Sequence, residues 1–219
     1  MQWVRYSAVL LFGSLLGSAG AAGQEVTAFR TVDRSTVRAP DFMRIYGSAS
    51  PPHGFVRFCE KRPEECSADN GPESRVDANS DRLSELDDIN RLINHAIAPA
   101  TDLEVYGIKE YWTLPSTRGD CEDYALLKRR MLIARGWPVS SLLLTVVRDE
   151  KGDGHAVLTA RTLQGDFILD NKVEKLLLWN RTPYEFVMRQ SYLDPQVWVA
   201  LDARHTPVST ALSGVQNDS

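Results

Sequence analysis

The chain has 219 residues, 43% hydrophobic and 25% charged, which suits one globular domain with a hydrophobic core. Its 25 basic and 29 acidic residues give a formal net charge of −4. Because no basic excess remains to neutralise a phosphate backbone, the composition argues against nucleic acid as a partner. It also excludes the collagen-like, coiled-coil and low-complexity classes.

Residues 1–22 have the pattern of a secretory signal peptide. Arg5 is the one charge before an apolar run at residues 8–16, and small residues follow that run. The run is too short to span a bilayer comfortably, so we predict cleavage after Ala21 or Ala22 and no stable membrane insertion. A membrane anchor or a buried first helix is the alternative.

The three cysteines are too few for a disulfide scaffold, and their odd number leaves at least one thiol without an internal partner. Cys59 and Cys66 lie close together in a polar, proline-containing segment, and export would place them in an oxidising compartment. We therefore predict that they pair, which should stabilise the fold by about 2–3 kcal/mol. Cys121 is then the free thiol. A zinc site formed by all three cysteines and a histidine is the alternative.

The composition divides the mature chain into three parts. Residues 23–79 are rich in proline, glycine, serine and charged side chains, with little periodicity, and we predict a loop-rich N-terminal arm held by the disulfide. Residues 80–203 carry helix and strand patterns and form the predicted domain. Residues 204–219 have the composition of a flexible tail.

Two helices are predicted at the start of the domain. Apolar side chains recur every three or four positions over residues 80–97, and Pro99 ends this helix. A loop over residues 101–119 leads to a second helix over residues 121–135, which a glycine, a tryptophan and a proline terminate. We expect the basic residues 128–130 to form a solvated face of this helix.

Strand patterns follow the helices. Short β-branched and apolar runs separated by glycine-containing turns predict three strands, at residues 142–147, 155–161 and 166–170. Two further segments, residues 179–187 and 196–201, are predicted as edge strands or a short helix. Helices followed by an antiparallel sheet define an α+β fold.

Cys121 begins the second predicted helix, where unpaired backbone N–H groups and the helix dipole favour a thiolate. A lone cysteine is often a buried small hydrophobic residue instead. Its neighbours here, Asp120, Glu122 and Asp123, do not form an apolar pocket, and their burial would be costly. The pattern therefore favours a nucleophile.

A nucleophilic thiol needs a base, and the base needs a group that orients it. Among the four histidines, His155 opens a strand directly after a glycine-containing turn. A four-residue turn at residues 162–165 would place His155 and Asp170 on one face of a hairpin, a diagonal step of roughly 7–8 Å apart. A two-residue loop with another register would set them opposite each other, and a bulge would separate them onto opposite faces.

The acidic side chains beside Cys121 raise a second question, because carboxylates close to a thiol raise its pKa. A bound divalent cation would neutralise them, and oxygen ligands from Asp120 and Glu122 suit a hard ion such as Ca²⁺. The alternative is an ordinary acidic helix cap, in which Asp120 caps the helix and the other acids complement its dipole.

Four segments of the sequence form a recognisable pattern: Tyr111-Trp112-Thr113-Leu114-Pro115, Arg118-Gly119-Asp120-Cys121-Glu122-Asp123-Tyr124-Ala125, Gly154-His155-Ala156-Val157-Leu158 and Ile168-Leu169-Asp170-Asn171. Through these segments the sequence resembles the bacterial transglutaminase-like cysteine peptidases, whose best-known type is the LapG periplasmic protease that releases biofilm adhesins. The resemblance covers about residues 81–198, and the arm with Cys59 and Cys66 resembles the exported alphaproteobacterial branch of the family. One departure is an extra leucine, Leu114, where the LapG pattern has Thr-Pro.

The resemblance implies a papain/transglutaminase-like fold and a periplasmic cysteine endopeptidase. Cys121 would be the nucleophile, His155 the base and Asp170 the group that orients it. The family pattern also implies calcium at Asp120 and Glu122. Trp112 would line the oxyanion region, or it is a core aromatic.

The implied partners are a protein substrate, with a cell-surface adhesin as one candidate, and an inhibitory membrane receptor. Two other functions stay open at this point. The same acyl-enzyme could transfer its acyl group to a lysine amine, as a transglutaminase does, or the domain could be a non-catalytic periplasmic binding module.

Overall fold

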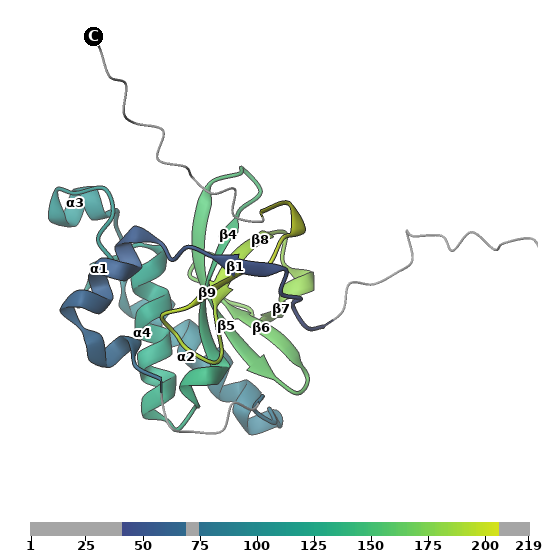
Figure 1. The fold of residues 1–219 in the computed structure, drawn as a ribbon. Helices are drawn as coiled ribbons and strands as arrows, with labels where there is room; N and C mark the ends of the chain where they lie inside the picture. The colour runs from purple at the N-terminus through teal and green to yellow at the C-terminus, as the bar shows by residue number, and fades with distance from the viewer. Residues whose placement is uncertain (1–40, 69–74, 206–219) are drawn as a thin grey trace, which may run out of the picture. The chain divides into compact units, whose positions relative to one another are not determined.

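A seven-stranded sheet with the order β1-β9-β8-β4-β5-β6-β7 organises the protein, and helices cover one of its faces (Figure 1). This computed structural model describes residues 41–68 and 75–205, which belong to one compact unit. The predicted signal peptide and tail lie outside the described residues, apart from the first positions of the tail. No helix within these two described ranges is long and apolar enough to cross a membrane.

The described helices and strands follow one another as an α+β fold. The helices are α1 (His53–Lys61), α2 (Ser80–Ala96), α3 (Asp102–Tyr106) and α4 (Cys121–Ala134). The sheet strands are β1 (Gly47–Ala49), β4 (Leu142–Arg148), β5 (Gly154–Thr162), β6 (Gly165–Leu169), β7 (Leu177–Leu178), β8 (Glu185–Gln190) and β9 (Trp198–Ala200). A separate parallel pair joins β2 (Ala98–Pro99) to β3 (Arg118–Gly119).

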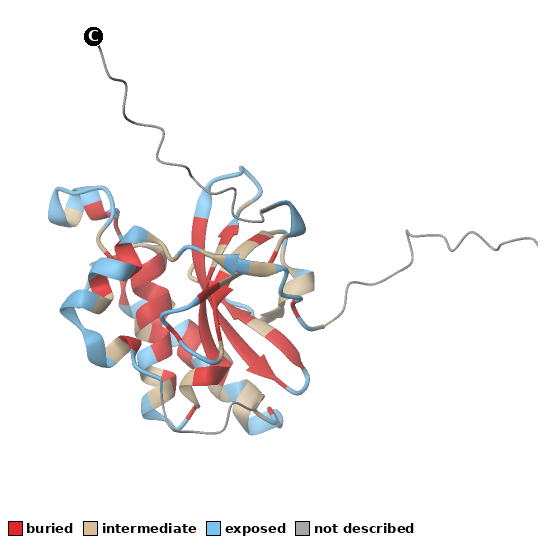
Figure 2. Ribbon diagram, in the orientation of Figure 1, coloured by how far each residue is buried: buried red, intermediate tan, exposed pale blue. Residues whose placement is uncertain are grey.

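The two long helices lie where the apolar periodicity predicts them. In α2, the side chain of Asn79 accepts a hydrogen bond from the Arg82 N–H at 3.0 Å and caps the helix. Leu86, Ile89 and Ile93 face inward from α2 and pack in the same core cluster as residues of α4. In α4, the residues that face the sheet are buried, as Figure 2 shows in red.

The β5–β6 hairpin fixes the position of two candidate site residues. Its register pairs Arg161 with Asp166, as the sequence predicts. The turn itself is shorter than expected, because Thr162 and Gly165 form one further pair of the same ladder. Gly165 makes this possible with a φ of 139°, a conformation that favours glycine.

The N-terminal arm contains more regular structure than its composition indicates. Its strand β1 pairs with β9, and its helix α1 buries Phe55 and Phe58 in the main core. Because β1 pairs with β9 and takes the edge, both β9 and β8 lie inside the sheet rather than at an edge as predicted. Low periodicity over residues 23–79 therefore concealed a short strand and an amphipathic helix.

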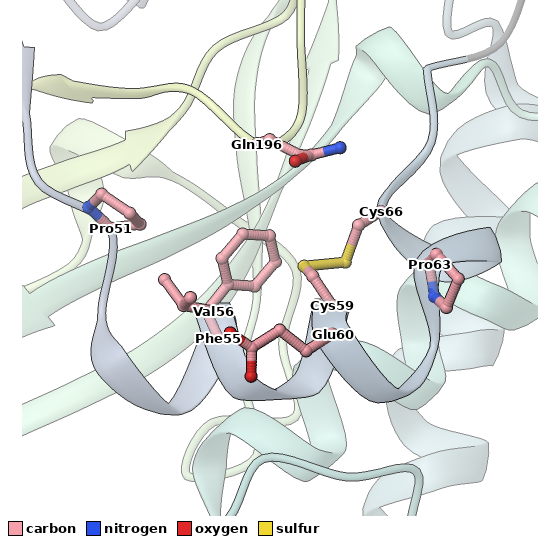
Figure 3. A pocket seen from close by; sticks show the side chains of 8 residues that line it. All are labelled: Pro51, Phe55, Val56, Cys59, Glu60, Pro63, Cys66 and Gln196. Atoms are coloured by element: carbon pink, nitrogen blue, oxygen red, sulfur yellow. A yellow bond between two sulfur atoms is a disulfide. The ribbon is translucent and has the colours of Figure 1, made fainter.

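Cys59 and Cys66 are joined by a disulfide, which links α1 to the 3₁₀ turn Pro63–Cys66 (Figure 3). The bond lies beside a groove of about 340 Å³ that Phe55 and Pro51 also line. Since both thiols are bonded to each other, the alternative of a three-cysteine zinc site is wrong. Cys121 is free.

A bulge in β8 directs the side chains of this strand into two cores that lie on opposite faces of the sheet. The β4–β8 register shifts between Val146 and Val147, so Val146 pairs with Met188 while Val147 pairs with Phe186. Met188 therefore packs against the core under the helices, and Phe186 packs in the smaller core on the other face. Bulges commonly redirect side chains in this way beside functional sites.

The expectation of a solvated basic face at residues 128–130 is wrong for two of the three side chains. Lys128 and Arg129 are 1% and 2% exposed, and only Arg130 lies on the surface. The Arg129 guanidinium donates to the backbone oxygens of Leu142 and Glu65 at 3.1 and 2.9 Å. The Lys128 ammonium lies 5.8 Å from the centroid of the Tyr124 ring.

We expect Lys128→Met to stabilise the fold by about 2–4 kcal/mol at pH 6. Burial lowers the pKa of Lys128 from 10.5 to about 7, with the charge of Asp170 opposing this shift. Below pH 7 both the folded and unfolded chains carry the lysine charge, so the folded state bears the full cost of burying it. Between pH 7 and 10.5 only the folded chain loses that proton, so the advantage of the variant should shrink.

Urea unfolding of both proteins at pH 6 and pH 9 measures this difference. The variant Arg130→Met serves as the matched control, because Arg130 is exposed on the same helix. A stability gain of equal size at both pH values would contradict the lowered pKa of Lys128 as the cause of the gain.

Candidate active site

Cys121 and His155 line the same cleft, although they come from different elements. Cys121 is the first residue of α4, and His155 is the second residue of β5. The cleft has a volume of about 220 Å³. Its remaining walls are Pro52, Glu110, Trp112, Glu122, Val146, Gly154, Ala156 and Met188.

His155 and Asp170 form a buried pair. The His155 Nε2 atom lies 2.8 Å from Asp170 Oδ1, and the two side chains are 1% and 4% exposed. The same oxygen accepts the Lys172 N–H at 3.0 Å, while Oδ2 accepts the Tyr184 hydroxyl. Burial alone would raise the pKa of Asp170, but these hydrogen bonds and the charge of His155 outweigh it and lower the pKa. An ionised Asp170 holds Nε2 as the N–H donor, which leaves Nδ1 as the basic nitrogen of the ring.

The Cys121 thiol donates to Glu122 Oε2 at 3.1 Å. Burial raises the pKa of Cys121 well above its ordinary value, and the negative charge of Glu122 adds to the rise. A hydrogen bond from the backbone N–H of Ala156 acts in the opposite direction. Without a cation, the surroundings of the thiol therefore keep it protonated.

Three aspartates form a cluster directly beside the nucleophile. One carboxylate oxygen from each of Asp102, Asp120 and Asp123 lies within 4.8 Å of the other two. One oxygen of each carboxylate accepts a backbone N–H: Tyr111 donates to Asp102, the Asp102 N–H donates to Asp120 at 3.3 Å, and Thr113 donates to Asp123 at 2.9 Å.

The remaining oxygen of each aspartate is buried and has no hydrogen-bond partner among the described residues. Burial raises the pKa of Asp102 to about 6 and that of Asp123 to about 8, and it also raises the pKa of Asp120. Unpaired buried carboxylates of this kind are costly. Three oxygen donors that converge in this way fit a hard divalent cation.

The sequence pairs Asp120 with Glu122 as calcium ligands, but in the structure Asp120 forms a cluster with Asp102 and Asp123. Asp102 and Asp123 complete the cluster, while the Glu122 carboxylate accepts the hydrogen bond of the thiol. Burial and the charge of Asp120 raise the pKa of Glu122 to about 9. Asp120 precedes α4 but makes no side-chain capping bond, so the acidic-cap alternative does not describe it.

Sequence reasoning missed Asp102 altogether and gave Asp123 no ligand role. Asp102 lies in the segment predicted as a loop, but it begins the short helix α3, which a capping box at Thr101 and Glu104 starts. That Thr-x-x-Glu pattern is readable in the sequence. Gly119 has a role here too, because a Cβ on it would lie 2.5 Å from Asp123 Oδ2.

Trp112 is a core aromatic, one of the two readings that the sequence allowed, and its role in the oxyanion region stays a prediction. Its ring lines the cleft and also packs edge-on against Phe55, with 5.8 Å between ring centroids. Its Nε1–H donates to Glu110 Oε1 at 2.7 Å, so this donor is already engaged. Gly54 in α1 approaches the indole so closely that a Cβ would lie 2.3 Å from Trp112 Cδ1.

We expect Gly54→Ala to destabilise the protein by about 1–3 kcal/mol and to displace Trp112 from the cleft wall. The measurement is the melting temperature together with tryptophan fluorescence. Gly47→Ala is the matched control, because a Cβ at Gly47 meets nothing within 4 Å. Equal effects of the two substitutions would show that Gly54 has no packing role.

Comparison with known proteins places these residues in a family. The family model described as bacterial transglutaminase-like cysteine proteinase matches residues 45–206. Calcium-bound LapG from Legionella pneumophila is 27% identical, with a TM-score of 0.47, over 53% of this chain and 68% of that one. EGTA-treated LapG from the same organism is 28% identical, with a TM-score of 0.43, over 48% and 61%. No curated protein matches the chain.

The family match extends from the residues before β1 to the end of the described chain. It includes the free thiol at the start of α4 and the paired histidine and aspartate. The chain therefore belongs to the bacterial transglutaminase-like cysteine proteinases, a family of cysteine peptidases with a mixed helix and antiparallel-sheet fold.

Proposed function

We propose that this cysteine peptidase is a calcium-dependent endopeptidase that uses Cys121, His155 and Asp170. The observation that carries the proposal is the shared cleft, which is lined by the free thiol of Cys121 and by His155, the residue that Asp170 holds from behind. We further propose that residues 1–22 direct export, so that the enzyme acts in the periplasm after cleavage near Ala21 or Ala22.

The reaction follows from the positions of these groups. His155 takes the thiol proton at Nδ1, and the thiolate sulfur attacks the carbonyl carbon of the scissile peptide bond. Backbone N–H groups at the start of α4 stabilise the negative charge that forms on the carbonyl oxygen. The proton on His155 then passes to the leaving amine, and the C–N bond breaks to give an acyl-enzyme. Water, deprotonated by His155, hydrolyses the thioester and restores the thiol.

Asp102, Asp120 and Asp123 would hold the calcium ion. When bound, the ion supplies positive charge that offsets the carboxylates near Cys121 and so favours the thiolate. Asp102 belongs to α3, whereas Asp120 and Asp123 lie at the start of α4, so a bound ion would connect these two segments. Glu122 lies next to both this cluster and the thiol, so its protonation would depend on the charge of each.

The test is to treat extracted surface proteins of the source organism with wild-type protein and with Cys121→Ser, and to map new peptide N-termini by mass spectrometry. An endopeptidase creates new N-termini only with the wild type. Equal sets of new N-termini from the two proteins would remove the proposed mechanism. A cell-surface adhesin, the substrate that the family resemblance implies, is the first protein to examine.

Amide transfer is the second candidate, because a lysine amine can attack the same acyl-enzyme in place of water. A fluorescent primary amine in the same incubation separates the two. Labelled, uncleaved protein supports transfer, whereas shortened fragments without label support hydrolysis. An inhibitory membrane receptor would lower either activity when it is added, without changing the products.

A further inference from the structure

Tyr184 contacts both members of the His155–Asp170 pair. Its hydroxyl donates to Asp170 Oδ2 at 2.5 Å. Its ring packs edge-on against the His155 ring, with 5.5 Å between centroids and an interplanar angle of 71°. Tyr184 therefore bonds to the Asp170 oxygen that does not contact His155, and its ring also packs against the imidazole.

The sheet explains how Tyr184 reaches this position. At the end of β4, Val147 pairs with His155 on one side and with Phe186 on the other, and Arg148 pairs with Gly154 and Glu185. The starts of β5 and β8 therefore flank the same end of β4. Tyr184 directly precedes β8, which β4 separates from β5, and its ring reaches the His155 ring across the end of β4.

Because of the bulge, β8 contributes side chains both to the cleft and to the core on the opposite face of the sheet. Met188, beyond the bulge, lines the cleft. Phe186, before the bulge, packs in the core on the opposite face, and Tyr184 packs against that same core. In an unbroken strand Tyr184, Phe186 and Met188 would share one face, so Met188 could not line the cleft while Tyr184 packs on the opposite face.

We propose that Tyr184 is a positioning residue of the active site, which holds the Asp170 carboxylate so that its other oxygen faces His155. This inference rests on the proposed function, in which His155 carries the proton. With Oδ1 accepting from His155 and the Lys172 N–H, and Oδ2 from Tyr184, the carboxylate has donors on both oxygens and cannot rotate without losing one. Fixed in this way, it sets both the tautomer and the ring orientation of the base.

The electrostatic surroundings agree with this role. Burial and the hydrogen bond to Asp170 raise the pKa of Tyr184, so the hydroxyl stays a donor across the physiological range. The other titratable groups around the pair are Cys121 and Glu122 at the cleft, Lys128, whose charge interacts with that of Asp170, Glu150 near Tyr184, and the Lys172–Asp149 ion pair. None of the hydrogen bonds that the structure gives to Asp170 Oδ2 comes from these groups within the described residues.

Tyr184→Phe tests the proposal, because it removes the hydroxyl and keeps the ring against His155. Without this donor, the Asp170 carboxylate accepts one hydrogen bond fewer, so its negative charge stabilises the protonated imidazole more strongly. The ring titration of His155, followed by NMR on histidine-labelled protein, should move to higher pH by about half a pH unit. The sequence has four histidines, so His155→Ala assigns the signal. With substrate, kcat should fall about tenfold at unchanged KM.

A double variant separates positioning from packing. In an Asp170→Asn background, Tyr184→Phe should leave the His155 titration where Asp170→Asn alone puts it, because the carboxylate on which the hydroxyl acts is gone. An equal displacement in that background would overturn the proposal. Tyr46→Phe is the control, because Tyr46 is exposed at the surface and its ring contact is to Arg44.

A second measurement leaves the fold untouched. Biosynthetic replacement of tyrosine by 3-fluorotyrosine makes the phenol a stronger hydrogen-bond donor, so the His155 titration should move to lower pH, opposite to Tyr184→Phe. An unchanged titration in both the fluorinated protein and Tyr184→Phe overturns the role of Tyr184. The NMR readings need no substrate, so they remain decisive even if the protein proves to have no peptidase activity.

Discussion

Cys121→Ala and His155→Ala are each expected to lower kcat by about 10³–10⁶-fold, and the double variant should be no worse than the more damaging single one. The sulfur forms the covalent bond and the imidazole moves its proton, so removal of either ends the same step. Asp170→Asn should cost less, about 10²–10⁴-fold, because the base keeps its place but loses the group that fixes its tautomer. Rates of substrate cleavage under single-turnover conditions give these values.

His95→Ala is the matched control, since His95 is exposed on α2 and lies 2.9 Å from Glu174 on the surface. Its activity should equal that of the wild type. Losses that multiply in the Cys121–His155 double variant would mean that the two residues act in separate steps, which contradicts a thiol–imidazole pair.

Chelation is expected to lower the melting temperature by about 5–10 °C and to abolish activity. If calcium is present at 100 times its dissociation constant, its binding adds about 2.7 kcal/mol to the free energy of unfolding. A domain of this size loses about 2–4 °C per kcal/mol. The physical reason is the burial of three carboxylate oxygens that have no hydrogen-bond partner among the described residues. EGTA and calcium titrations followed by calorimetry provide the measurement.

Asp102→Asn should reverse the sign of that effect. In EGTA the variant should melt above the wild type, because it removes a carboxylate whose pKa is raised by burial and by the charges of Asp120 and Glu110. In calcium it should melt below the wild type, because a ligand is lost. Asp88→Asn, at an exposed site on α2, should change neither value. A variant that melts below the wild type in both buffers would indicate that Asp102 only supports the fold.

Most of the fold could be predicted from periodicity. The helices over residues 80–97 and 121–135 and the three central strands lie within one or two residues of their predicted ends. The register of the β5–β6 hairpin follows from the predicted turn at residues 162–165, which pairs Arg161 with Asp166, and the structure keeps that pairing. Local pattern and short-range pairing were sufficient for these elements.

The parts that could not be predicted depend on contacts between distant segments. Asp102 joins Asp120 and Asp123 only because β2 and β3 pair and bring residues 98–102 beside the start of α4. Lys128 and Arg129 are buried because α4 lies against β5. Tyr184 reaches Asp170 through a strand order and a bulge that leave no mark in the sequence.

The arm also constrains how such an enzyme can be switched on. Many proteases are made as zymogens and gain activity when a leading segment is clipped away. Here β1 completes the sheet edge, and α1 contributes Phe55 to the core and Pro52 to the wall of the cleft. A cut anywhere between β1 and the disulfide-bonded turn would damage the site rather than release it. Activation by a cut within this part of the arm is therefore not expected, and control would act on an intact β1 and α1, through the ion, a bound protein or access to the substrate.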